Sequence, residues 1–124
     1  MSDPDTLGAE FARALAAKDS ARLLDLMHPE IDFRAMTPSR TWKPEGPEEV
    51  LSVLFTRWFE DSDEIRGLVQ LESDMVVDRE RVGYRLSVTN PDGRFLVDQQ
   101  AYVEPRDGRI GWMRVLCSGY RPSD

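Results

Sequence analysis

The spacing of apolar residues changes from a helical to a strand-like period about halfway along the chain. In the first half, apolar side chains recur every three or four residues, which is the period of a helix with one buried face. After Asp61 they alternate with polar residues, which is typical of half-buried strands. The pattern predicts three helices followed by a sheet, and the helical stripes are Leu7, Phe11, Ala14 and Leu15, then Leu23, Leu24, Leu26 and Met27, then Leu51, Leu54, Phe55 and Trp58.

Capping residues and prolines mark where these elements begin. Asp3-Pro4 is a helix start, with an acceptor at the N-cap and a proline at the first helical position. Asp19 or Ser20 caps the second helix, and residues 46–49, "GPEE", open the third with acids in its first turn. Residues 30–36, "EIDFRAM", alternate and predict a short strand before the third helix.

The second half predicts four strands in meander order. They cover residues 64–75, 81–89, 94–103 and 109–118, and the last two connections, "NPDG" and "PRDG", are good turn sequences. The expected fold class is α+β, with N-terminal helices packed on a curved antiparallel sheet. We expect a single domain over residues 1–124.

The register of the hairpins decides which side chains share a sheet face. If Asn90 pairs with Arg94, and Glu104 with Arg109, the more apolar face carries Tyr84, Asp98, Gln100, Tyr102 and Met113. This face should receive the helices, so we expect Asp98 and Gln100 to lie inside. A slip of one residue would turn Gln99 inward instead.

The opposite face combines arginine and tryptophan with aliphatic residues. Gln99, Trp112 and Arg114 belong to it in this register. Tryptophan and arginine are enriched at protein interfaces. We therefore expect a homodimer through this outward face.

Composition narrows the possible partners. The net charge is −7 and the cationic residues are scattered, which argues against nucleic acid as a partner. No apolar run reaches the roughly 20 residues that span a bilayer, and the N-terminus lacks the pattern of a signal peptide, so we expect no membrane partner and a cytoplasmic location. The single cysteine and single histidine exclude an intrachain disulfide and a Cys/His zinc site, and we expect neither a metal nor a cofactor.

Several stretches resemble the nuclear transport factor 2-like superfamily, in particular its small SnoaL-like proteins. These stretches are "LLDLMHPEIDFRAM", "GPEEVLSVLFTRWF", "YRLSVTNPDGRFLVDQQAYV" and "GRIGWMRVLC". The resemblance implies a cone-shaped fold with a pocket between helices and sheet, often in a dimer. The superfamily includes ketosteroid isomerases, polyketide cyclases, dehydratases and epoxide hydrolases, so the fold alone does not specify a reaction.

The resemblance also bears on single residues. Ketosteroid isomerases carry their base at the end of the first strand, where the inward position here is Ala35, which cannot move a proton. A second acid of isomerases and cyclases lies on the strand that here contains Asp98 and Gln100. "MRVL" resembles the final isomerase strand, which implies that Met113 points into the pocket.

Each candidate has both a functional and a structural interpretation. Asp98 is a candidate general base whose pKa an apolar pocket would raise, or a carboxylate paired with an arginine. Gln100 could orient a ligand carbonyl, Tyr84 and Tyr102 could donate to an oxyanion, and Trp58 could wall the pocket, or all four could serve packing.

His28 and Cys117 also have two interpretations each. His28 could act as an acid or base, but its place before Pro29 favours a helix-end role. Cys117 could be a nucleophile only with a base beside it, so a buried inert thiol is the simpler interpretation.

Two functions remain open. The first is a small-molecule-binding domain with an apolar pocket between helices and sheet and no catalytic constellation. The alternative is a proton-transfer enzyme of the isomerase, cyclase or dehydratase type, acting on a small apolar carbonyl compound with Asp98 as general base.

Overall fold

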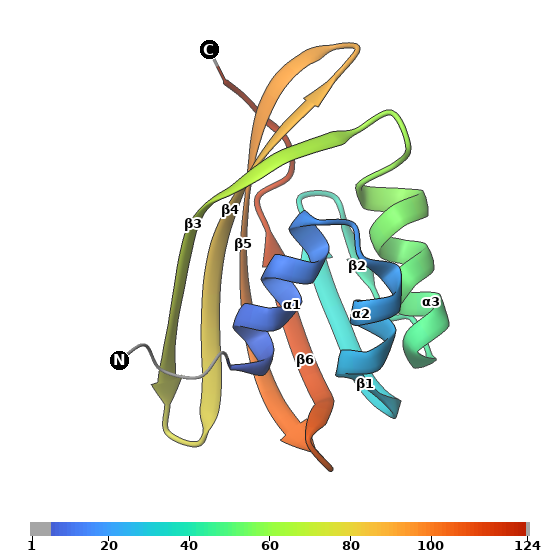
Figure 1. The fold of residues 1–124 in the computed structure, drawn as a ribbon, viewed down its shortest axis with the longest axis vertical. Coiled ribbons are helices and arrows are strands. Elements are labelled where there is room, and N and C mark those ends of the chain that lie inside the picture. The colour runs from blue at the N-terminus through green and yellow to red at the C-terminus, as the bar shows by residue number, and fades with distance from the viewer. Residues whose placement is uncertain (1–5, 124) are drawn as a thin grey trace.

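The fold was analysed in a computed structural model, which describes residues 6–123. Its helices lie on one face of a curved sheet whose other face is open (Figure 1). The elements in chain order are α1 (Leu7–Ala16), α2 (Ser20–Leu26), β1 (Met27–Thr37), β2 (Arg40–Trp42), α3 (Gly46–Ser52), a π-helical segment η1 (Val53–Trp58), β3 (Glu64–Val76), β4 (Arg79–Asn90), β5 (Gly93–Arg106), β6 (Arg109–Cys117) and β7 (Arg121–Pro122). This arrangement confirms the predicted α+β class.

Side-chain caps start the first two helices. The Thr6 hydroxyl accepts a hydrogen bond from the N–H of Ala9 at the start of α1, at 3.2 Å. Asp19 caps α2 by accepting from the N–H of Arg22, at 3.0 Å. These bonds satisfy amide groups that have no partner within the helix. The start predicted at Asp3-Pro4 lies outside the described residues.

The third helix is longer than its α-helical part. α3 begins at Gly46 with Pro47 in its first turn and passes directly into η1. The wide turn closes where the N–H of Phe59 donates to the carbonyl of Leu54, at 2.8 Å. π-helical turns are rare and occur frequently at functional sites.

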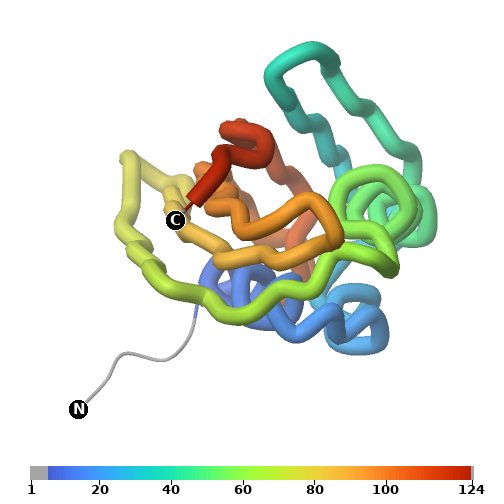
Figure 2. The backbone as a smooth tube through the Cα atoms, turned by 90° about the horizontal axis from the view of Figure 1, so that it is seen from above, coloured from blue at the N-terminus to red at the C-terminus, as the bar shows by residue number. Residues whose placement is uncertain are grey.

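The sheet has the strand order β2-β1-β6-β5-β4-β3, and the short strand β7 pairs with the beginning of β5, at Phe95 and Leu96. The predicted neighbours β4, β5 and β6 follow one another with antiparallel pairing, as expected. β1 pairs with β6 in parallel, so β1 and β2 extend the sheet beyond β6. The sequence did not predict this parallel pairing. Viewed from above, the β1–β2 hairpin in teal projects beyond the rest of the sheet (Figure 2).

The predicted register of β5 is wrong. Asn90 pairs with Gly93 rather than Arg94, so the β4–β5 loop has two residues instead of three. The Asn90 side chain accepts from the N–H of Asp92, at 2.8 Å, and this bond tightens the turn. A bulge after Glu104 changes the β5–β6 register as well, because Glu104 pairs with Trp112 rather than Arg109. The first change shifts β5 by one residue against β4, and the second shifts it by three residues against β6. Because both shifts are odd, the two faces of β5 are exchanged.

The helix-covered face is a continuous apolar core. β4 and β6 contribute the predicted residues, whereas β5 contributes Val97, Ala101 and Val103 in place of Leu96 and Tyr102. The largest fully buried side chains include Phe11, Leu15, Phe33, Phe59, Leu86 and Met113. These side chains fill the space between the helices and the sheet.

The start of α1 is fixed to the sheet by a buried carboxylate. Glu80 on β4 accepts from the N–H of Gly8 at 2.9 Å and from the hydroxyl of Ser73 at 2.7 Å, and Thr6 also contacts it. A Cβ atom at position 8 would lie only 2.7 Å from an oxygen of Glu80. A larger side chain at position 8 would displace the Glu80 carboxylate from these hydrogen bonds, and glycine avoids this.

Within residues 6–123, no helix combines the length and the apolar character that crossing a membrane would require.

Candidate functional site

Asp98 lies on the open face of the sheet, not on the helix-covered face as we expected. Its neighbours in β5, Val97 and Gln99, are buried against the helices, so alternation turns Asp98 outward. The Nε of Arg85 donates to Asp98 Oδ1 at 2.7 Å, and Arg121 also pairs with the carboxylate. This hydrogen bond and the charge of Asp98 raise the pKa of Arg85. Asp98 is thus a carboxylate paired with arginines, which was the structural alternative to a general base.

Gln99 is the polar residue of β5 that faces the helices. It is 2% exposed, and its Oε1 accepts from the hydroxyl of Tyr84 at 2.6 Å. Its Nε2 donates to the sulfur of Cys117 at 3.3 Å. Burial raises the pKa of Tyr84, so this phenol stays neutral. The sequence pointed to Gln99 only as the outcome of a one-residue slip.

The Tyr84–Gln99–Cys117 cluster is closed on itself. The phenol, the amide oxygen and an amide N–H are all used within it, and the thiol also accepts from the N–H of Gly119 at 3.4 Å. The Gln99 amide carries no charge, burial keeps the Tyr84 phenol protonated by raising its pKa, and the cluster contains no carboxylate or imidazole. The cluster therefore satisfies buried polar groups and holds no general base.

Gln100 and Tyr102 also lie outward, where they line an apolar cavity of about 370 Å³. Within residues 6–123, neither side chain makes a hydrogen bond, so both are available to a ligand. The wall is mainly aliphatic, and the remaining lining residues are Arg34, Ala35, Met36, Thr41, Arg114, Val115 and Leu116. We call this hollow the aliphatic cavity.

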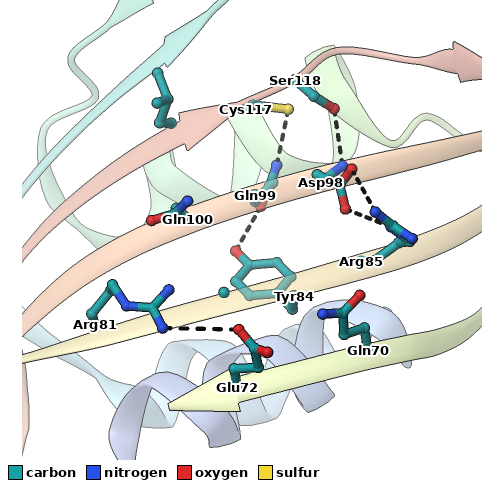
Figure 3. Close-up of a pocket in the computed structure, with 12 residues that line it drawn as sticks. Gln70, Glu72, Arg81, Tyr84, Arg85, Asp98, Gln99, Gln100, Cys117 and Ser118 are labelled. Atoms are coloured by element: carbon teal, nitrogen blue, oxygen red, sulfur yellow. Dashed lines mark hydrogen bonds and ion pairs between the residues drawn. The ribbon is translucent and has the colours of Figure 1, made fainter. Parts of the chain in front are cut away.

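A second, polar cavity of about 590 Å³ is lined by residues such as Arg81, Arg85 and Gln100 (Figure 3). It shares Gln100 and Leu116 with the aliphatic cavity. Its charged side chains are already paired. Arg81 donates to both oxygens of Asp74, at 3.0 and 2.9 Å, and this pairing lowers the pKa of the carboxyl. Arg85 pairs with Asp98 beside it. A charged ligand would have to displace an existing partner here.

Trp58 and Met113 lie in the core. Met113 on β6 is fully buried, and the resemblance had implied that it lines a pocket. Trp58 is 9% exposed and packs edge-on against Trp42, with ring centroids 6.3 Å apart. Its Nε1 is the only buried side-chain nitrogen or oxygen in the described part of the chain that lacks a hydrogen-bond partner. Neither residue lines any of the cavities described here.

Three further positions that the sequence singled out have structural rather than catalytic surroundings. Ala35 is buried on the helix-covered face, so the position of the isomerase base is inward and inert, as expected. His28 accepts from the N–H of Glu30 at 3.0 Å and contacts Asp107 at 3.2 Å, rather than covering helix carbonyls. Cys117 contacts Gln99 and Gly119 rather than His28, and no group of three His, Cys, Asp or Glu in residues 6–123 could hold a metal ion.

Comparisons of sequence found no match: no protein-family model and no curated protein resembles the chain. Solved structures do match. A provisionally named isomerase from Rhodopseudomonas palustris has a TM-score of 0.74 at 20% identity, covering 94% of this chain and 93% of that one. A provisionally named SnoaL-like polyketide cyclase from Mesorhizobium loti has a TM-score of 0.60 at 17% identity, covering 88% and 94%.

A third similar structure was solved with a small molecule bound. It is a hypothetical protein with a ketosteroid isomerase-like fold from Catenulispora acidiphila, in complex with trimethylamine. Its TM-score is 0.67 at 13% identity, covering 94% of this chain and 88% of that one. These likenesses show the fold, and they confirm the predicted resemblance to nuclear transport factor 2-like and SnoaL-like structures at that level.

Proposed function

We propose that this chain, which has the nuclear transport factor 2-like fold, is a small-molecule-binding domain without a catalytic role. Its ligand would occupy the aliphatic cavity on the open sheet face, rather than a pocket between helices and sheet. The expected ligand has an apolar body and a carbonyl or hydroxyl group. Gln100 and Tyr102 would contact that polar group.

The observation that carries the proposal is the exposure of large apolar side chains around this cavity. Met36 is 55% exposed and Leu116 is 58% exposed, and both belong to its wall. Covering such surface stabilises a complex by about 25 cal/mol for each Å². Ligand sites are commonly apolar hollows with a few polar groups that fix orientation, and Gln100 and Tyr102 provide these groups.

The charged residues at the rim do not favour a charged ligand. Arg114 contacts a carboxylate oxygen of Asp32 at 3.2 Å and donates to the carbonyl of the same residue at 3.0 Å. Arg34 lies 3.8 Å from the same carboxylate. Because both guanidinium groups already have a partner, a neutral ligand fits the cavity better.

The geometry supports binding better than the alternative of proton transfer. A base at Asp98 would need an apolar environment, yet two arginines hold its carboxylate on the open face. The helix-covered face offers Ala35 and the closed Tyr84–Gln99–Cys117 cluster instead. Asp98 as a catalytic base stays a prediction, and the structure gives it no apolar pocket.

Methyl NMR of the methionines tests the proposal. Titration with acetophenone, a small aromatic ketone, should shift the methyl signal of Met36 in the aliphatic cavity and leave buried Met113 unchanged. Leu116→Gln removes part of the wall and should weaken binding about tenfold, given that a buried leucine contributes about 1.5–3 kcal/mol.

A matched control distinguishes the cavity from general exposure. Val69 is 57% exposed and lines none of the cavities, so Val69→Gln should leave acetophenone binding unchanged. If Met36 does not respond, or if both variants weaken binding equally, the proposed site is wrong.

A homodimer through the open sheet face is a second proposal. Trp112 and Arg114 lie on this face as predicted, whereas Gln99 is buried on the other one. The Trp112 ring is flanked by the guanidinium groups of Arg79 and Arg114, at 4.4 and 4.5 Å from its centroid. Light scattering should show twice the monomer mass at micromolar concentration, and Leu116→Lys should return the monomer. Detection of monomer alone over that range would contradict the dimer.

A cytoplasmic location and the absence of a nucleic-acid partner stay predictions. The first rests on the absence of a bilayer-length apolar run and of a signal-peptide pattern, and the second on the net charge of −7 and the scattered cationic residues. Gel-shift experiments with random-sequence DNA and RNA should show no retardation.

A further inference from the structure

Three cationic side chains line a further cavity, which lies on the opposite side of the β1–β2 hairpin from the aliphatic cavity. This cavity has a volume of about 280 Å³ and lies where β2 and the segment after it face α3 and η1. Arg40, Lys43 and Arg57 line it, together with Glu49, and the other lining residues are Thr41, Trp42, Pro44, Ser52 and Val53. We call it the cationic cavity. Figure 1 shows α3 beside β1 and β2.

In the part of the chain that the structure describes, no ion pair neutralises the three cations. Within residues 6–123, neither Arg40, Lys43 nor Arg57 has a carboxylate within 4.0 Å, although the chain carries a net charge of −7. Glu49 lines the cavity without pairing with any of them. Three cations and one carboxylate leave a local excess of two positive charges. The polar cavity on the sheet differs, because its arginines are each held by an acid.

Trp42 holds two of these cations in place. The guanidinium carbon of Arg40 lies 3.8 Å from the centre of the Trp42 ring, and that of Arg57 lies 5.5 Å from it. Stacking on an indole uses the flat face of a guanidinium group and leaves its N–H edge free. Among residues 6–123, neither the Arg40 nor the Arg57 guanidinium group donates a hydrogen bond, so the N–H groups of both are available for the two-point hydrogen bonds that arginine makes with phosphate.

The indole is itself fixed. Its Nε1 donates to the hydroxyl of Thr37 at 3.0 Å, and the buried ring of Trp58 packs against it edge-on. Arg57 belongs to the π-helical segment η1, whose wide turn is closed by the bond from Phe59 to Leu54. The fixed indole thus holds Arg40 and Arg57 before any ligand binds, which lowers the entropy cost of binding.

We propose that the cationic cavity binds the phosphate group of a small organic phosphomonoester. The two negative charges of a phosphomonoester match the local excess of two positive charges. Thr41 and Ser52 add hydroxyl donors, and Trp42, Pro44 and Val53 form an apolar wall for the organic part. The site is independent of the aliphatic cavity, with which it shares only Thr41 among its lining residues.

Calorimetry with inorganic phosphate and with phenyl phosphate tests this site. Both probes should bind saturably, more weakly as salt is added, and phenyl phosphate should bind more tightly because its ring adds apolar contact. The indole N–H signal of Trp42 should shift in NMR spectra with either probe. Equal affinity for the two probes would overturn the organic part of the proposal, and absence of saturable binding at about 10 mM, the range of very weak ligands, would overturn the site.

Variants of Arg57 separate charge from geometry. Arg57→Gln should weaken phosphate binding about tenfold or more, as expected for the loss of a charge-assisted hydrogen bond. Arg57→Lys keeps the charge but loses the planar pair of N–H donors that arginine offers, and should bind phosphate with intermediate affinity. Arg57 is exposed, so both variants should keep the thermal stability of the parent.

Arg109→Gln is the matched control. Arg109 is also an exposed arginine, and it lines none of the cavities described here. Its replacement changes the net charge by the same amount and should alter phosphate affinity less than about twofold, because distant surface charges are screened. Equal losses in Arg57→Gln and Arg109→Gln would show general charge attraction and overturn the site.

Discussion

Arg85 on β4 lies directly opposite Asp98 on β5, and the two side chains meet on the open face of the sheet with Arg85 Nε 2.7 Å from Asp98 Oδ1. This distance is typical of a strong, hydrogen-bonded ion pair, but both side chains are more than a third exposed. Solvent therefore screens much of their attraction. The position of Asp98 is explained by this partner and by Arg121, and needs no catalytic role.

The first prediction concerns Asp98→Asn. The change should lower the free energy of unfolding by about 1 kcal/mol or less, as for other exposed ion pairs. Acetophenone binding should not change, because Asp98 does not line the aliphatic cavity. Chemical denaturation and the methyl titration measure the two effects. A loss of several kcal/mol, or the loss of binding, would show that Asp98 does more than pair with arginines.

The second prediction concerns alkaline pH. Burial raises the pKa of Tyr84 and Tyr120 above the ordinary 10.0 of a tyrosine. Below pH 10 both phenols are neutral whether the chain is folded or unfolded, so they give no pH dependence there. Above pH 10 the unfolded chain loses protons that the folded chain keeps, so stability falls by about 1.4 kcal/mol per pH unit for buried Tyr84 and by less for half-buried Tyr120, whose phenolate solvent partly screens.

Phenolate absorbance can follow this effect. In a Tyr102→Phe background only Tyr84 and Tyr120 remain, since the chain has three tyrosines. Their absorbance should then rise together with the loss of far-ultraviolet circular dichroism. Phenolate formed near pH 10 in a protein that stays folded would contradict the buried environment of Tyr84 and the half-buried environment of Tyr120.

The third prediction is a double-mutant cycle on the buried Tyr84–Gln99 hydrogen bond. Tyr84→Phe leaves the Gln99 carbonyl without its donor, and Gln99→Leu leaves the phenol without its acceptor. Each single change should cost about 1–3 kcal/mol, the usual cost of an unsatisfied buried polar group. The double variant should cost less than the sum of the two, because it leaves neither partner unpaired. Strict additivity in urea denaturation would mean that the two groups do not interact.

The fourth prediction concerns the contact between Gly8 and Glu80. Gly8→Ala would push the Glu80 carboxylate out of its hydrogen bonds with Gly8 and Ser73, and should destabilise the fold by about 1–2 kcal/mol. Gly67→Ala is the control, because a Cβ atom there meets nothing within 4 Å. In a Glu80→Ala background the same Gly8→Ala change should be neutral or stabilising, since alanine favours a helix by up to about 1 kcal/mol. Thermal melting of the parent, of the two single variants Gly8→Ala and Glu80→Ala, and of the double variant measures the effect of Gly8→Ala in each background. Equal effects in both backgrounds would exclude the clash.

The sequence was informative wherever one interpretation was much stronger than its competitor. The helical stripes predicted the three helices, with Asp19 or Ser20 as the cap of α2. In the structure Asp19 is the cap, and Leu23 and Leu26 are buried, whereas Leu24 is exposed. On β4, the alternation of Val82, Tyr84 and Leu86 with Gly83, Arg85 and Ser87 leaves one face clearly apolar. The structure buries that face, because only its side chains gain by leaving water.

The face of β5 could not be decided in this way. Leu96 and Tyr102 flank two polar residues on one face, while Val97, Ala101 and Val103 flank Gln99 on the other. Both alternations are plausible, so the choice depends on the length of one loop. The bond from Asp92 to the Asn90 side chain gives that loop two residues, and this turned Asp98 outward and Gln99 inward.

The candidate sites also depended on tertiary structure. Arg40, Lys43 and Arg57 appear as isolated charges along the chain, and they share a cavity only because α3 and η1 pack beside the first hairpin. Local patterns thus determined the elements and their order, since period, caps and turns act over a few residues. Register and packing decided which polar groups face the core, the open face or a cavity, because a shift of one residue in a strand exchanges its two faces.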